Sequence, residues 1–126
     1  MKLILLAALG GAIGSAARYL VNVSAGHLFG VNFPWGTIAV NILGSFIMGL
    51  VVALGALKFN MTSEMRVFIA TGLLGGFTTF SAFSLDVALL FERKEIGLAG
   101  LYLAGSVGLS ILALFAGLYL VRTWLT

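Results

Sequence analysis

Long apolar stretches separated by short polar ones fill this chain from end to end. A bilayer core is crossed by about 20 apolar residues of helix, and four stretches reach that length. Membrane-spanning helices are therefore expected at residues 3–23, 35–57, 65–91 and 96–121. Pro34 and Trp35 suit a helix start at the membrane surface, and Thr62 precedes the third stretch as a helix cap would. The pattern predicts an all-α integral membrane protein made of one four-helix domain.

The third stretch contains a segment, Gly72–Ser84, that suits a continuous helix poorly. Glycines weaken its first half, and hydroxyl residues crowd the second half. A bilayer offers no water to loosened backbone groups, so this segment must be buried in protein or line a polar path. We expect the helix to break near residues 75–79, in the middle of the membrane. Phe77, Phe80 and Phe83 recur every third residue, a spacing that by itself favours packing.

Charged residues are few and lie near the ends of the predicted helices. Four spans place both termini on one side, together with the basic residues Lys2, Lys58, Arg66 and Arg122. The other side has Arg93 and Lys94, with Arg18 at a helix end. This is a weak bias under the positive-inside rule, so we expect insertion in both orientations. Copies that face opposite ways would pair as an antiparallel homodimer.

The composition excludes most catalytic chemistry. The chain has no cysteine and 1 histidine, so disulfides and thiolate metal sites are excluded. No paired carboxylates, and no nucleophile beside a base, occur at membrane depth. The basic residues form no run that indicates nucleic-acid binding. We therefore expect a protein that is not an enzyme and that interacts with the lipid bilayer.

Neutral polar residues are plentiful at membrane depth, and they favour an anion as the transported species. They are Thr37, Asn41 and Ser45 in the second stretch, Thr78, Thr79, Ser81 and Ser84 in the third, and Ser106 and Ser110, in line with Tyr102, in the fourth. Hydroxyl and amide groups can point hydrogens at a negative ion, and the edge of a phenylalanine ring is electropositive. Backbone carbonyls freed at the glycine break could instead hold a cation.

Two other functions are consistent with a chain of this kind. A proton-coupled exporter of small molecules needs a carboxylate within the membrane, and Asp86 is the candidate. At 1.5 Å per residue Asp86 lies about 8 Å from the end of its helix, a depth that suits a vestibule better than a carrier site. A structural membrane subunit without transport is the third possibility.

Specific motifs carry a resemblance to a known family. They are Gly10-Gly11-Ala12-Ile13-Gly14 followed by Arg18, Pro34-Trp35-Gly36-Thr37 followed by Asn41, and the whole of Gly72–Ser84. Together they resemble the Fluc/CrcB fluoride channels, small bacterial four-helix proteins that form antiparallel dimers. The resemblance covers essentially the whole chain. It implies a passive, fluoride-selective channel of the bacterial inner membrane that exports cytoplasmic fluoride, with two pores per dimer.

The resemblance also implies roles for particular residues. Asn41, Phe80 and Phe83 would contact fluoride, and the pore-lining residues would further include Thr79, Ser81, Tyr102, Ser106 and Ser110. Arg18 and Asp86 would lie in an aqueous vestibule. Gly75 and Thr78 would hold a structural sodium ion at the dimer interface through their backbone carbonyls. The chain departs from the family at Leu114, where some members continue the polar track with threonine, and at Asp86, where glutamate is common.

Overall fold

The computed structural model describes residues 1–57 and 60–124. Lys58, one of the basic residues counted above, lies outside the described residues. Helices account for nearly all of the described chain: α1 Lys2–Phe29, α2 Trp35–Leu57, α3 Ser63–Arg66, η1 Val67–Leu74, α4 Gly75–Phe77, α5 Ser81–Glu92 and α6 Ile96–Trp124. Here η1 is a π-helix. The elements α3, η1, α4 and α5 together form the third span, Ser63–Glu92.

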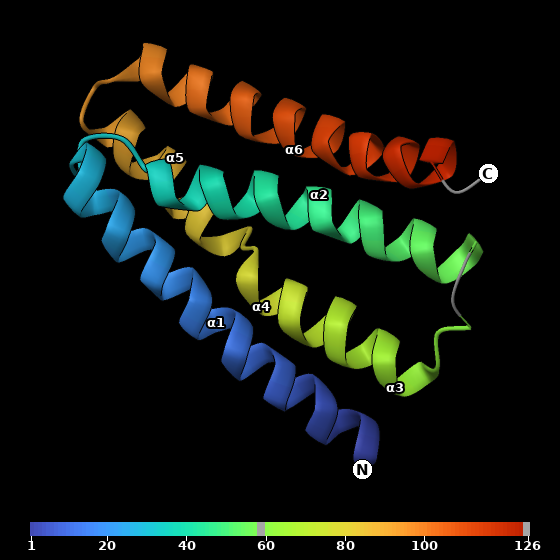
Figure 1. Cartoon of the computed structure of the whole chain (residues 1–126). Coiled ribbons are helices and arrows are strands. Elements are labelled where there is room, and N and C mark those ends of the chain that lie inside the picture. Colours follow the sequence, from blue (N-terminus) through green and yellow to red (C-terminus); the bar gives the residue numbers. More distant parts are fainter. Residues whose placement is uncertain (58–59, 125–126) are drawn as a thin grey trace.

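Within the described residues, four helical spans are long and apolar enough to cross a membrane, in agreement with the predicted all-α fold. Figure 1 shows both termini at the same end of the bundle, as an even number of spans requires. α2 and α6 lie side by side along their length, and α1 packs against η1 and α4. The predicted cap is also present, because the Thr62 hydroxyl accepts a hydrogen bond from the Met65 N–H at 3.2 Å.

The first helix is longer than the sequence predicted. The expected end near Val23 is wrong because α1 continues to Phe29. Gly30 ends the helix with a positive φ of 84°, which glycine adopts readily, and its N–H donates to the carbonyl of Gly26. A helix of 28 residues extends past a hydrocarbon core of about 30 Å. The last turns of α1 therefore reach the membrane surface.

Glycines allow the helix backbones to approach closely. A Cβ atom at Gly72 would lie 2.9 Å from the Cα of Gly10, and one at Gly76 would lie 2.7 Å from the carbonyl oxygen of Gly11. Across the bundle, Gly117 of α6 lies as close to the backbone of α2. Such spacing leaves no room for a side chain and is typical of helix pairs in membranes. By contrast, Gly108 of α6 has open space beside it, so it makes no such close approach.

The third span breaks at Thr78–Phe80. Gly75, which was expected to begin the break, is still helical with φ of −63° and ψ of −36°. Thr78 is extended, with φ of −88° and ψ of 161°, and the helix resumes at Ser81. The break thus falls at the C-terminal side of the predicted range, because hydrogen bonds from another helix engage the backbone there.

Candidate functional site

Asn41 of α2 holds the backbone of the helix break. Its Nδ2 donates to the carbonyl oxygen of Thr79 at 3.0 Å, and its Oδ1 accepts from the Thr79 N–H at 2.8 Å. The amide group therefore pairs with both polar groups of a single residue, as a neighbouring strand would. Two partly buried backbone groups that would otherwise be unpaired in the membrane are satisfied in this way.

The hydroxyls of the two threonines complete the hydrogen bonding around the break. Thr78 Oγ1 donates to the carbonyl oxygen of Leu74 at 2.9 Å, so it binds back onto its own helix. Thr79 Oγ1 accepts from the Ala82 N–H at 3.2 Å, which caps the first turn of α5. These bonds fix the chain on both sides of the break.

Two carbonyls beside the break lack their usual helical donors. In a continuous α-helix the carbonyl of Gly75 accepts from the N–H of Thr79, and that of Thr78 accepts from the N–H of Ala82. Here the first N–H donates to Asn41 and the second to the Thr79 hydroxyl. The carbonyl oxygens of Gly75 and Thr78 are thereby left without the partners that a helix would supply.

A cavity of about 350 Å³ lies beside the break, and we call it the break cavity. It is lined by Asn41, Ser45, Gly75, Thr78, Thr79, Phe80, Phe83, Ser106, Val107 and Ser110. None of these residues is charged. The structure thus brings most of the predicted site residues of three different helices together around one space.

The serines of α6 supply the unpaired polar atoms of the break cavity. Ser106 Oγ and Ser110 Oγ are buried, and neither has a hydrogen-bond partner among the described residues. Buried hydroxyls usually find a partner, often a carbonyl of their own helix. Two unpartnered hydroxyls one turn apart therefore mark a place where a polar ligand or water fits.

The two phenylalanines of the break cavity differ in burial. Phe83 is 5% exposed, whereas Phe80 is 76% exposed on the side of the bundle. Their ring centroids lie 5.6 Å apart, with the ring planes inclined by 50°. The edge of a phenylalanine ring is electropositive, so rings that line a cavity can offer weak contacts to an anion.

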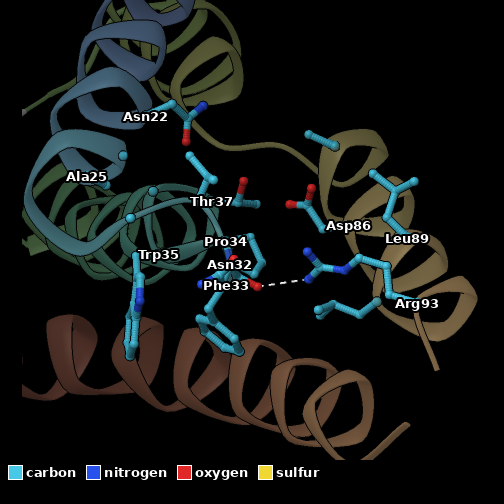
Figure 2. A pocket seen from close by; sticks show the side chains of 16 residues that line it. Asn22, Ala25, Asn32, Phe33, Pro34, Trp35, Thr37, Asp86, Leu89 and Arg93 are labelled. Atoms are coloured by element: carbon cyan, nitrogen blue, oxygen red, sulfur yellow. Dashed lines mark hydrogen bonds between the residues drawn. The ribbon is translucent and has the colours of Figure 1, made fainter. Parts of the chain in front are cut away.

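A second cavity, of about 440 Å³, lies where α1 ends and α2 begins, and we call it the loop-end cavity (Figure 2). Its polar lining includes Asn22, Asn32, Thr37, Asp86 and Arg93. Figure 2 shows the Arg93 guanidinium between Asp86 and the loop that carries Asn32. The guanidinium Nη2 donates to the Asn32 carbonyl oxygen at 2.8 Å and to Glu95 Oε2 at 3.1 Å.

Tyr102 connects the two cavities although it lines neither. Its hydroxyl donates to Asp86 Oδ2 at 3.0 Å, on the side of the loop-end cavity. Its ring lies 5.2 Å from that of Phe83, which lines the break cavity, and meets Phe33 edge-on at 5.4 Å. The ring is fully buried, so Tyr102 packs between a residue of one cavity and a residue of the other.

Comparison with known proteins identifies the family. Residues 5–118 match the family described as "CrcB-like protein, Camphor Resistance (CrcB)". The chain belongs to the CrcB family. A relative from Agrobacterium fabrum, named "Fluoride-specific ion channel FluC", is 59% identical over 119 residues, which cover 94% of this chain and 95% of the relative. Relatives with the same name occur in Rhodospirillum centenum, at 54% identity over 98% of both chains, and in Rhizobium etli, at 56% over 94% of both.

Membership of the CrcB family, together with four long apolar helices, makes the chain a multi-pass membrane protein that is not an enzyme. The structure places four predicted site residues of this CrcB-family chain outside the lining of the break cavity, and one of them is Tyr102, described above. Ser81 is exposed at the start of α5 and lies outside the lining of both cavities. Asp86 lies in the loop-end cavity. Arg18 is partly buried, and its Nε donates to the carbonyl oxygen of Gly76 at 3.1 Å, on the α1 side of the break.

Sequence reasoning missed two residues of the loop-end cavity. The charge pattern placed Arg93 only at one side of the membrane, and no pattern assigned a role to Asn22. Their positions depend on the extra turns of α1 and on the contact of Arg93 with the Asn32 carbonyl. No local pattern in the sequence encodes either feature.

Proposed function

We propose that this CrcB-family protein is a passive, fluoride-selective channel that lets cytoplasmic fluoride leave the cell. The observation that carries the proposal is the pair of buried, unpartnered hydroxyls of Ser106 and Ser110 in a cavity without charged residues. The names of the relatives, fluoride-specific ion channels, support the same conclusion. Hydroxyl and amide groups can point hydrogens at a small anion, and the lining contains no carboxylate that would repel one.

The chemistry of permeation is replacement of the hydration shell. The hydroxyls of Ser106 and Ser110 rotate to point hydrogens at the ion, and Asn41 can donate through the second hydrogen of Nδ2. The edges of Phe80 and Phe83 add weak electropositive contacts. Each contact is weaker than a charge pair, so the ion is held loosely enough to move on. No covalent step and no bound energy source takes part.

A second copy, facing the opposite way, completes the proposed channel. In one copy the ring of Phe80 is 76% exposed, and the break cavity opens on the side of the bundle. A polar opening cannot face hydrocarbon without cost, so another protein surface is expected to cover it. The weak charge bias across the predicted spans supports an antiparallel partner. An antiparallel dimer would contain two equivalent pores, each lined by both copies.

A sodium ion at the dimer interface is the proposed structural cofactor. The carbonyls of Gly75 and Thr78, whose helical donors are engaged elsewhere, suit it as ligands. Hard cations prefer oxygen ligands of this kind. The same two residues line the break cavity. Sodium would join the two copies by binding carbonyls from each, and would add positive charge near the path of the anion.

Efflux from liposomes tests the proposed function. Purified protein is reconstituted with internal fluoride, and release is followed with a fluoride electrode in the absence of a proton gradient. We expect rapid efflux through the wild-type protein and its loss in Phe80→Ile. The matched control is Phe115→Ile, which changes an exposed ring of α6 away from both cavities and should conduct normally. A proton-coupled exporter that uses Asp86, or a purely structural subunit, would release no fluoride in this assay.

The serines and the dimer are tested separately. Ser106→Ala with Ser110→Ala should slow efflux at least about tenfold, since two charge-assisted hydrogen bonds are lost, while the protein elutes as folded dimer. Normal efflux from that variant would exclude the break cavity as the path. Labelling of single cysteines, introduced at either end of the bundle, with a membrane-impermeant reagent measures insertion. A single orientation would contradict the antiparallel dimer.

A further inference from the structure

The helix break depends on a side chain from a different helix. Without α2, the N–H of Thr79 has one obvious acceptor, the carbonyl of Gly75, and forming that bond would continue the helix through the break. The Oδ1 of Asn41 takes this N–H at 2.8 Å, and its Nδ2 holds the carbonyl of the same residue at 3.0 Å. Asn41 thus competes directly with helix formation at this position.

Thr79 acts in the same way on the following turn. The N–H of Ala82 would donate to the carbonyl of Thr78 in a helix, but the hydroxyl of Thr79 accepts it at 3.2 Å. Each of the two diverted N–H groups therefore corresponds to one freed carbonyl. The freed carbonyls are those of Gly75 and Thr78, the pair proposed above to bind a cation.

We propose that Asn41 and the hydroxyl of Thr79 are positioning residues that hold the helix break open and so keep the carbonyls of Gly75 and Thr78 available to a cation. Asn41 then has two roles, because the same amide group lines the break cavity. The ion path and the cation site are connected through a single side chain. This inference rests on the proposed sodium site.

The test measures the affinity for sodium rather than conduction. Asn41→Leu has similar volume and no hydrogen-bonding group, so the N–H of Thr79 returns to the carbonyl of Gly75. Thr79→Val likewise returns the N–H of Ala82 to the carbonyl of Thr78. Each variant removes one carbonyl ligand per copy, which should raise the sodium concentration for half-maximal stabilisation by about tenfold or more. The readout is the thermal unfolding of the full chain in detergent, in sodium chloride against N-methylglucamine chloride at equal ionic strength.

Two matched controls separate positioning from a general loss of packing. Thr79→Ser keeps the hydroxyl and should stay within about twofold of the wild type, since the bond to Ala82 is retained. Ser45→Ala changes another residue of α2 that lines the break cavity but makes no described bond to the break. It should leave the sodium dependence unchanged. Amide hydrogen exchange at Thr79 adds an independent readout, because protection should change in Asn41→Leu and not in Ser45→Ala.

Each outcome decides between the two proposals. If Asn41→Leu and Thr79→Val both keep the sodium dependence of the wild type, the positioning role is overturned. The fluoride efflux of the wild type would still support a channel. A wild-type protein that conducts fluoride but is indifferent to sodium would also overturn it. Absence of fluoride efflux from the wild type would refute the channel. The sodium dependence of unfolding would still test whether Asn41 and Thr79 hold the helix break open.

Discussion

Gly14 offers the sharpest test of how α1 supports the helix break. A Cβ atom at this position would collide with the carbonyl oxygen of Leu73 and would lie 2.8 Å from the backbone nitrogen of Phe77. Ordinary van der Waals contacts begin at 3.4 Å, which is 0.6 Å longer than the distance to Phe77. The helices α1 and α4 would therefore have to move apart by at least 0.6 Å. Both obstacles are backbone atoms, which cannot swing aside as a side chain can. The substitution Gly14→Ala therefore has to move one helix.

The cost can be estimated against a neighbouring control. Overpacking of a close contact costs about 1–3 kcal/mol of stability. The better helix propensity of alanine offsets about 0.5–1 kcal/mol of this cost. Gly11→Ala makes the same chemical change in the same helix, but no heavy atom lies within 4 Å of the new Cβ. We expect Gly14→Ala to be less stable than Gly11→Ala by about 1–3 kcal/mol.

The measurement is reversible unfolding in mixed micelles, with fluoride efflux recorded on the same preparations. Gly14→Ala should also slow efflux, because α4 leads directly into the break at Thr78. Equal unfolding free energies of the two variants would show that α1 does not pack against η1 and α4 as closely as described. Lower stability with unchanged efflux would show that the break tolerates movement of α1, and would refute the coupling of this contact to the site.

Two further predictions concern arginines. Arg93→Gln should lower fluoride efflux about twofold at low ionic strength, because the charge of Arg93 lies at the loop-end cavity. Near about 1 M salt the substitution should have little effect, since salt screens that charge. The control is Lys94→Gln, which removes a charge from the same turn but outside that cavity. An equal effect of both variants would point to general surface charge. Arg18→Gln should cost about 1–2 kcal/mol in unfolding free energy, since the bond to the Gly76 carbonyl is weakened, and unchanged stability would show that this bond contributes nothing.

The four spans were predictable because hydropathy and length decide them. In lipid every backbone group must be paired within its segment, so a long apolar stretch has few alternatives to a helix. The end of α1 was not predictable from the same signal. Polar residues and glycines interrupt the apolar pattern from Asn22 onward, yet helical hydrogen bonding continues until Gly30, which has a φ of 84°. Hydropathy reports where the lipid ends, whereas the local backbone decides where the helix ends.

The site was only partly predictable. The glycines and hydroxyls of Gly72–Ser84 indicated a break, and the break lies within that segment at Thr78–Phe80. Its position depends on Asn41, 38 residues away in the sequence from Thr79. The pairing of an amide side chain with both backbone groups of one residue has no local signature. For the same reason the contact of Arg18 with the Gly76 carbonyl could not be read from its position near a helix end.

The phenylalanines show why a periodic pattern can mislead at a break. On a continuous helix Phe80 and Phe83 would lie on one side and share one environment, which is why their spacing favoured packing. Phe80 instead belongs to the break, whereas Phe83 lies on α5. Phe83 is buried against Tyr102, as packing requires, but Phe80 remains 76% exposed beside the unpartnered serines. An exposed ring next to polar atoms in a membrane protein needs a further protein surface to cover it, and so the break that frees Phe80 also creates the need for a partner.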